Sequence, residues 1–164
     1  MKRLLSIALL LSAVLTASAQ GTWTVSHREA DPLIGQIAQD VYMYDVKGVG
    51  SLVVWDWGKP EFRLITDQGV FNQKTMAGVG GRCVPINVGF YDKGNNLKTK
   101  FELIMFEEDN HGGKWIATGG FYMGGRGNIR KMLSRIKSGD GYVRVVAELY
   151  NKPNFDMIIT PYQQ

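Results

Sequence analysis

Apolar and polar positions alternate along most of the chain, in short runs that turn sequences separate. The runs VPINVGFY (84–91), LKTKFELIMFEE (97–108) and KWIATGG (114–120) are joined by the turns DKGNN and DNHGG. A period of two is typical of a strand that buries one face, so we predict that these runs form an antiparallel meander. The residues predicted to face the core are Val84, Ile86, Val88, Phe90, Phe101, Leu103 and Met105.

Further strands are predicted on both sides of this meander. The upstream candidates are TWTVSH, VYMYD, SLVVWDW and EFRLIT, with GKP as a tight turn between the last two. Residues 33–41 would also suit one face of a helix, and the Val and Tyr content favours a strand from Val41 onward. Residues 72–82 have no clear period and are predicted to form a long loop. Downstream, YVRVVAELY and NFDMIIT alternate again, with Val143, Val145, Ala147 and Leu149 predicted to face the core.

One stretch, GGRGNIRKMLSRIKSGDG (124–141), follows a helical period instead. Asn128 is a favourable N-cap, and Ser138 and Gly139 mark the end of the predicted helix. Its apolar stripe, at positions i, i+3, i+4 and i+7, consists of Ile129, Met132, Leu133 and Ile136. Basic residues occupy the rest of its surface, and those in the last turn complement the helix dipole.

This order of elements predicts the fold class. Strands followed by a single helix and two more strands favour a mainly β protein, a single-domain antiparallel β-sandwich over residues 20–164. One short amphipathic α-helix lies near the C-terminus. We expect it to plug one open end of the sandwich or to cover an edge.

The first 19 residues have the pattern of a secretory signal peptide. Lys2 and Arg3 precede an apolar run over residues 4–15, and the small-residue triplet 17–19 follows. The apolar run is too short for a membrane span, which needs about 20 residues. We expect cleavage before Gln20 and a periplasmic or secreted mature protein with no membrane span.

Charge and cysteine content narrow the function classes. The formal net charge of +4 falls to +2 when Lys2 and Arg3 are removed, which is too little for the dense basic stripe of a nucleic-acid-binding protein. Cys83 is the only cysteine, so no intrachain disulfide can form. A lone cysteine behaves as a small hydrophobic residue, and we expect a buried thiol.

The C-terminal half resembles two related groups of proteins. Phe106-Glu107, Trp115, the helix IRKMLSRI, YVRV and FDMII follow one another between residues 101 and 160. This order is similar to that of the invasion-associated locus B proteins and of the VasI-type accessory proteins of type VI secretion. Both groups are exported β-sandwich proteins without an established catalytic activity, which is what the resemblance implies for this chain. Where they favour Arg-Phe-Asp, this chain has Met105-Phe106-Glu107.

The sequence contains no catalytic or metal-binding motif. His27 and His111 lack metalloprotease or zinc-finger spacing, and neither a Gly-x-Ser-x-Gly elbow nor a histidine close to Cys83 is present. The run EEDNH (107–111) is interpreted as a solvated hairpin turn, with a cation site as the alternative. The glycines of 119–127 lack the order of a phosphate loop and are interpreted as a connection. No catalytic residue, metal or cofactor is predicted.

Two sets of side chains remain as candidate binding residues. Trp55 and Trp57 share one face of a strand with Val53, which favours a core position, and the alternative is an aromatic platform for a sugar ring. The cations of the predicted helix are expected to form a solvated face, and the alternative is that this face meets an acidic protein or an anionic envelope polymer. These cations are Arg126, Arg130, Lys131, Arg135 and Lys137.

Three functions follow from these observations. The first is an exported, non-enzymatic β-sandwich protein that binds a partner in the cell envelope or outside the cell. The second is a carbohydrate-binding module. The third is a small secreted hydrolase, which would need two convergent carboxylates. The partner, the pathway and the oligomeric state do not follow from the sequence.

Overall fold

The computed structural model describes residues 20–76, 82–119 and 125–163, with only the backbone for residues 107–111. It is a mainly β structure of two antiparallel sheets and one helix, as predicted. The elements are β1 (Thr22–Arg28), β2 (Gln39–Val46), β3 (Gly50–Asp56), β4 (Pro60–Thr66), β5 (Lys74–Thr75), β6 (Arg82–Tyr91), β7 (Leu97–Met105), β8 (Glu107–His111), β9 (Lys114–Gly119), α2 (Gly125–Ser138), β10 (Tyr142–Ala147) and β11 (Phe155–Ile159).

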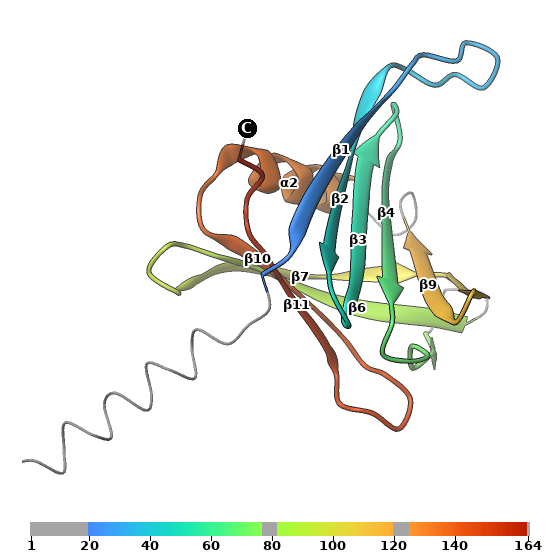
Figure 1. Ribbon diagram of the computed structural model, residues 1–164, viewed down its shortest axis with the longest axis vertical. Coiled ribbons are helices and arrows are strands. Elements are labelled where there is room, and N and C mark those ends of the chain that lie inside the picture. The colour runs from blue at the N-terminus through green and yellow to red at the C-terminus, as the bar shows by residue number, and fades with distance from the viewer. Residues whose placement is uncertain (1–19, 77–81, 120–124, 164) are drawn as a thin grey trace, which may run out of the picture.

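The first sheet has the order β1-β2-β3-β4-β9-β8, and the second has the order β11-β10-β6-β5, with β7 also paired to β6. Every pairing is antiparallel. The strands of the two sheets cross in the view of Figure 1, and the hairpin of β1 and β2 extends past the end of its own sheet. The strand order makes β1 and β8 the edges of the first sheet.

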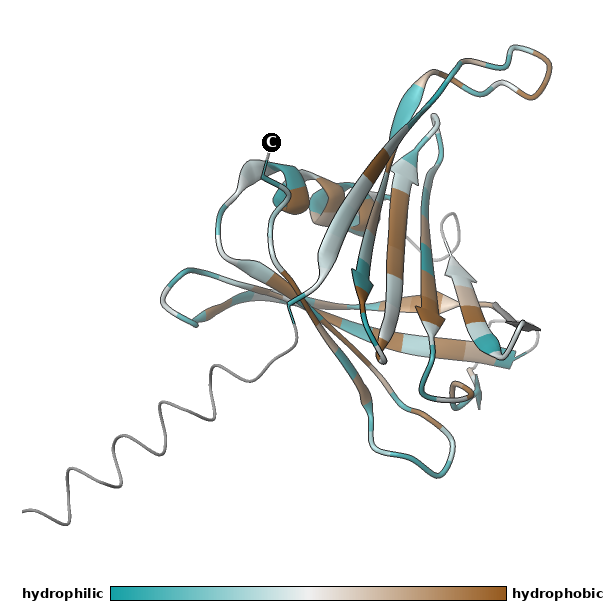
Figure 2. Cartoon of the chain, in the orientation of Figure 1, coloured by the Kyte–Doolittle hydropathy of each residue, from teal (hydrophilic) through white to brown (hydrophobic). Residues whose placement is uncertain are grey.

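The core lies between the inner faces of the two sheets. Alternate residues of each strand are buried there, for example Leu52 and Val54 on β3 and Ile86 and Val88 on β6. Apolar and polar bands accordingly follow one another along the strands in Figure 2. All the residues predicted to face inward on β6, β7 and β10 belong to this core or pack against it, and Cys83 is buried.

The predicted three-stranded meander is wrong in its third strand. β7 pairs with β6, whereas β8 and β9 form a hairpin that pairs with β4 in the other sheet. The chain changes sheets at Phe106, whose N–H donates to the carbonyl of Thr118 at 2.9 Å. Alternation continues through this point because both sheets bury one face, so periodicity reports burial and not the pairing partner.

Helix α2 plugs one open end of the sandwich. It contacts strands of both sheets, and Ile129, Met132 and Ile136 are fully buried in the core. Leu133 is only partly buried, so the predicted core stripe is narrower than expected. The helix begins at Gly125, so Asn128 is not its N-cap. Helix propensity, which disfavours glycine in the first turn, is a weak guide where packing fixes the segment.

The C-terminal tail ties this end of the molecule together. The N–H of Tyr162 donates to the carbonyl of Ile136 near the end of α2, and the indole N–H of Trp23 on β1 donates to the carbonyl of Thr160 at 2.8 Å. The rings of Trp23, Tyr42 and Tyr162 contact one another edge to face. The tail thereby connects an edge strand of the first sheet to the helix.

Two predictions fall partly or wholly outside the described residues. The signal peptide occupies residues 1–19, which the structure does not describe. The predicted loop 72–82 contains the short strand β5, and its residues 77–81 are not described. Among the described residues, no helix is long and apolar enough to cross a membrane.

Candidate functional site

A groove runs between helix α2 and the adjacent ends of β2 and β3. It consists of two hollows of about 440 and 420 Å³ that share four lining residues, Asp56, Arg130, Leu133 and Lys137. We call this surface the α2 groove. Its further lining residues are Ile37, Gln39, Asp40, Tyr42, Gly58, Ser134 and Ser138.

An ion pair crosses the α2 groove and fixes the helix to β3. The Nε of Arg130 donates to Oδ2 of Asp56 at 2.7 Å, and its Nη2 donates to the carbonyl of Gly58 at 3.4 Å. The hydrogen bond to Asp56 raises the pKa of the Arg130 guanidinium. Asp56 is the last residue of β3, at a position that alternates inward with Leu52 and Val54. The Arg130 cation is therefore already neutralised by Asp56 within the protein.

The remainder of the groove combines apolar surface with one further cation. The Nζ of Lys137 lies 5.9 Å from the centroid of the Tyr42 ring, a distance typical of a cation–π contact. Burial raises the pKa of the Tyr42 phenol, which stays neutral at physiological pH. Leu133 supplies partly buried apolar surface beside it, and Ile37 adds an exposed isoleucine.

Gln39 is a polar irregularity beside this surface. Gln39 lines the groove and is 8% exposed. Neither polar atom of its side-chain amide has a hydrogen-bond partner among the described residues. A buried amide without partners costs about 1–3 kcal/mol, so the packing here is not optimised for stability alone.

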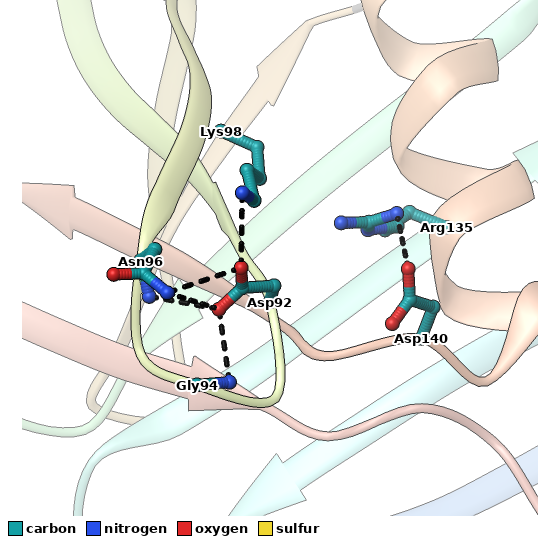
Figure 3. A network of polar contacts seen from close by, with 6 residues as sticks. All are labelled: Asp92, Gly94, Asn96, Lys98, Arg135 and Asp140. Carbon is teal, nitrogen blue, oxygen red and sulfur yellow. Dashed lines mark hydrogen bonds and ion pairs between the residues drawn. The ribbon is translucent and has the colours of Figure 1, made fainter.

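The helix cations predicted to form one binding face are divided between two faces. A helix turns by about 100° per residue, which places Arg130 and Lys137 about 20° apart and puts Lys131 and Arg135 about 100° and 140° away from Arg130. Arg135 donates to Asp140 at 3.2 Å, and its guanidinium lies 5.9 Å from the ring of Phe90. Figure 3 shows this pair facing away from α2 and toward the β6–β7 turn.

Four of the five helix cations face solvent as expected, although Arg130 is also ion-paired, whereas Arg135 is only partly exposed. Arg130 is held by Asp56, and Arg135, with a side chain 23% exposed, is held by Asp140. Arg126, Lys131 and Lys137 are exposed as expected. The sequence shows the cations but not their acidic partners, because these come from β3 and from the turn after the helix.

The two tryptophans do not lie in the core between the sheets. Leu52 and Val54 of β3 face inward, so Val53 and Trp55 face outward. Trp55 is nevertheless only 7% exposed, since the guanidinium groups of Arg28 and Arg63 lie 5.8 and 5.6 Å from its ring. Trp57 is half-buried beneath Lys59. The two rings consequently do not form an open platform for a sugar.

Other candidate chemistry falls where the structure gives less detail. Among the described residues, no group of three or more His, Cys, Asp or Glu side chains could hold a metal ion. The interpretation of EEDNH (107–111) as a turn is wrong for its backbone, which forms strand β8 paired with β9. Gly125 and Gly127, interpreted as part of a connection, belong to α2. The side chains of 107–111 and the glycines of 120–124 lie outside the described residues. His27 lies at the end of β1, where its Nδ1 is 3.0 Å from Asp40 Oδ1.

Comparison with known proteins adds no further assignment. No family model, curated protein or solved structure matches the chain. The candidate site therefore rests on the geometry of the α2 groove. Sequence reasoning found Arg130 as a candidate but missed Asp56 and Tyr42, because their proximity to the helix is a tertiary contact between segments about 75 residues or more apart.

Proposed function

We propose that this is an exported, non-enzymatic β-sandwich protein that binds a polypeptide partner in the cell envelope or outside the cell through the α2 groove. One observation supports the α2 groove as the binding site. Half-buried Leu133, Lys137 and the Arg130–Asp56 ion pair lie side by side along one helix face. The proposal of export rests on the N-terminal signal pattern and on the resemblance to exported families.

The charge pattern of the groove favours a polypeptide over an anionic polymer. Two carboxylates, Asp40 and Asp56, lie among the lining residues beside the cations Arg130 and Lys137. A polyanion would face repulsion from Asp40 and would find Arg130 already paired with Asp56, whereas a peptide segment can place charges of either sign and an apolar side chain against Leu133. The partner expected is therefore a protein segment with an acidic residue for Lys137.

A matched pair of charge reversals tests this proposal. Lys137→Glu alters the groove, and Lys131→Glu makes the same change about 120° away around the helix, at a residue that does not line the groove, with both lysines exposed. The wild type and each variant would be used to capture partners from the exported fraction of the host, and the captured protein would then be titrated in purified form. We expect Lys137→Glu to weaken binding at least about tenfold and Lys131→Glu to leave it unchanged. Equal binding by all three proteins would refute the groove as the site.

A further inference from the structure

The hairpin of β1 and β2 ends in a long projection with an apolar tip. Residues 29–38, which we call the arm, extend beyond the first sheet and end in a hydrophobic turn (Figures 1 and 2). At the tip, Leu33 is 95% exposed and Ile34 is 62% exposed. Exposed large apolar residues gathered at one tip are unusual in a soluble domain and are typical of an interaction site.

Hydrogen bonds within the arm fix its conformation. Asp31 and Gln36 form an isolated antiparallel bridge, with reciprocal N–H to carbonyl hydrogen bonds of 2.9 and 2.8 Å. The Asp31 carboxylate accepts from the N–H of Leu33 at 3.1 Å, and Gly35 adopts a left-handed φ of 69°. These bonds hold Leu33 and Ile34 at the end of a closed turn, so the apolar tip is preorganised for contact.

The charge of the arm restricts what can cover it. The sequence EADPLIGQIA contains Glu29 and Asp31 and no lysine or arginine. An acidic, apolar tip is poorly suited to an anionic membrane surface, which attracts basic segments. It suits an apolar hollow in a protein whose rim carries cations.

The second sheet carries a hollow with these properties on its outer face. Its volume is about 380 Å³, and Gly89 of β6 forms part of its lining. A side chain at Gly89 would meet the ring of Tyr91 at 2.9 Å and Leu97 at 3.3 Å, so the hollow depends on the missing side chain. Apolar surface comes from Tyr91, Leu97 and Val146. We call it the Gly89 hollow.

The rim of the Gly89 hollow carries two cations, of which Arg144 is paired with Asp156, so Lys100 is the rim cation that an incoming carboxylate can meet. Lys100 and Arg144 lie on it with one carboxylate, Glu102. The guanidinium of Arg144 is held in place by Asp156, with Nε 2.9 Å from Oδ1. The pKa of Arg144 is raised by this hydrogen bond, so the cation persists at every physiological pH. Leu97, 48% exposed, remains open to solvent beside these cations.

We propose that the arm of one copy of this protein inserts Leu33 and Ile34 into the Gly89 hollow of a second copy, with Glu29 facing Lys100. The arm leaves the end of the first sheet, and the hollow lies on the outer face of the second sheet. The contact is therefore head to tail, and each copy keeps one arm and one hollow for further neighbours. Such heterologous contacts build rings or open chains rather than closed pairs.

Sedimentation equilibrium over a wide concentration range tests this proposal. We expect the average mass of the mature wild type to rise with concentration beyond that of a dimer. Leu33→Asp combined with Ile34→Asp removes the tip, and Leu97→Asp alters the hollow. Each variant should raise the dissociation constant at least about tenfold, since burial of one leucine is worth about that factor. Tyr150→Asp, an exposed apolar residue outside both surfaces, is the matched control and should not change the mass.

Mixing the two variants gives the sharpest result. The tip variant keeps an intact hollow and the hollow variant keeps an intact arm, so an equimolar mixture should form a dimer that cannot grow. Native circular dichroism and melting of each variant alone would establish that both are folded. A wild type that stays monomeric, or a mixture of folded variants that does not dimerise, would overturn the proposal. Binding of the wild type to phosphatidylglycerol vesicles that the tip variant loses would likewise overturn it, by assigning the tip to lipid.

Discussion

Two hairpin ends of this molecule differ in how their side chains are placed. In the turn between β6 and β7, residues 92–96, the Asp92 carboxylate closes the loop and accepts hydrogen bonds from the N–H groups of Gly94 and Asn96, each at 2.9 Å. The arm between β1 and β2 has one bridge and directs Leu33 and Ile34 outward. The first end is stabilised by its own contacts, whereas the second leaves apolar surface uncovered.

The surroundings of the two ends differ as well. Lys98 pairs with Asp92 at 3.1 Å, the hydroxyl of Tyr142 donates to Asn95 at 2.6 Å, and the rings of Tyr91 and Tyr142 stack (Figure 3 shows the Asp92 contacts). The arm meets the body only near its base, for example through the N–H of Ile37 and the carbonyl of Trp57 at 3.5 Å. Packing thus identifies the β6–β7 turn as structural and the arm as available for contact.

The largest expected difference comes from one substitution made at two glycines. Gly141 and Gly35 have similar left-handed φ values of 66° and 69°. A Cβ at Gly141 would collide with the carbonyl of Tyr91, whereas at Gly35 it would meet nothing within 4 Å. Gly141→Ala should cost at least about 2 kcal/mol in unfolding free energy beyond the cost of Gly35→Ala, which is about 1–2 kcal/mol from φ alone. Urea melts compare the two, and equal costs would mean that the close packing at Gly141 is absent.

The strands and the helix could be predicted from the sequence because each buries one face. Burial imposes a period of two on β6 and β10 and a period of 3.6 on α2, and both periods are visible in the residues. The change of sheet at Phe106 could not be predicted, since it leaves the period unchanged. The same holds for Asp56, whose role depends on the position of a helix 74 residues away in sequence.

The arm shows where the apolar pattern is misleading. Leu33, Ile34 and Ile37 fit one face of a helix in the sequence, but the structure places Leu33 and Ile34 in an exposed turn and Ile37 exposed after it. Periodicity assumes that apolar residues are buried within their own chain. The division of the helix cations, in contrast, was accessible to sequence reasoning, because the angle between Arg130 and Arg135 follows from the helix period alone.

Acid should weaken the β6–β7 turn. Hydrogen bonds from Asn96 and then Lys98 lower the pKa of Asp92 to about 2 from 3.8. The ionised carboxylate therefore contributes stability above pH 3.8, and this contribution is lost as the pH falls through about 2. Asp92→Asn should make the unfolding free energy less dependent on pH between these values. An NMR titration of the Asp92 carboxyl with a midpoint near 3.8 would contradict the expected effect.

A weaker pH effect of opposite direction is expected at the base of the arm. The hydrogen bond to Asp40, and then the charge of Glu29, raise the pKa of His27 above 6.5. The protonated ring stabilises the hairpin below pH 6.5, and this contribution disappears as the pH rises through the higher folded-state pKa. Amide hydrogen exchange at Arg28 and Asp40 should become faster over that range relative to its normal base-catalysed increase. His27→Gln should remove this additional acceleration, and an unchanged pH profile in the variant would show that the ring has no role there.

The smallest effect on folding should come from the most apolar exposed site. Leu33→Asp combined with Ile34→Asp changes two large residues, but Leu33 is 95% exposed and its side chain is already hydrated in the monomer. Exposed substitutions away from caps and ion pairs usually change stability by less than about 0.5 kcal/mol each, and the N–H of Leu33 keeps its bond to Asp31. Melting at a concentration where the wild type is monomeric would measure this change directly. A loss of several kcal/mol would mean that the tip packs within its own chain. The two hairpin ends would then differ in what they pack against, and the arm would not be available for binding.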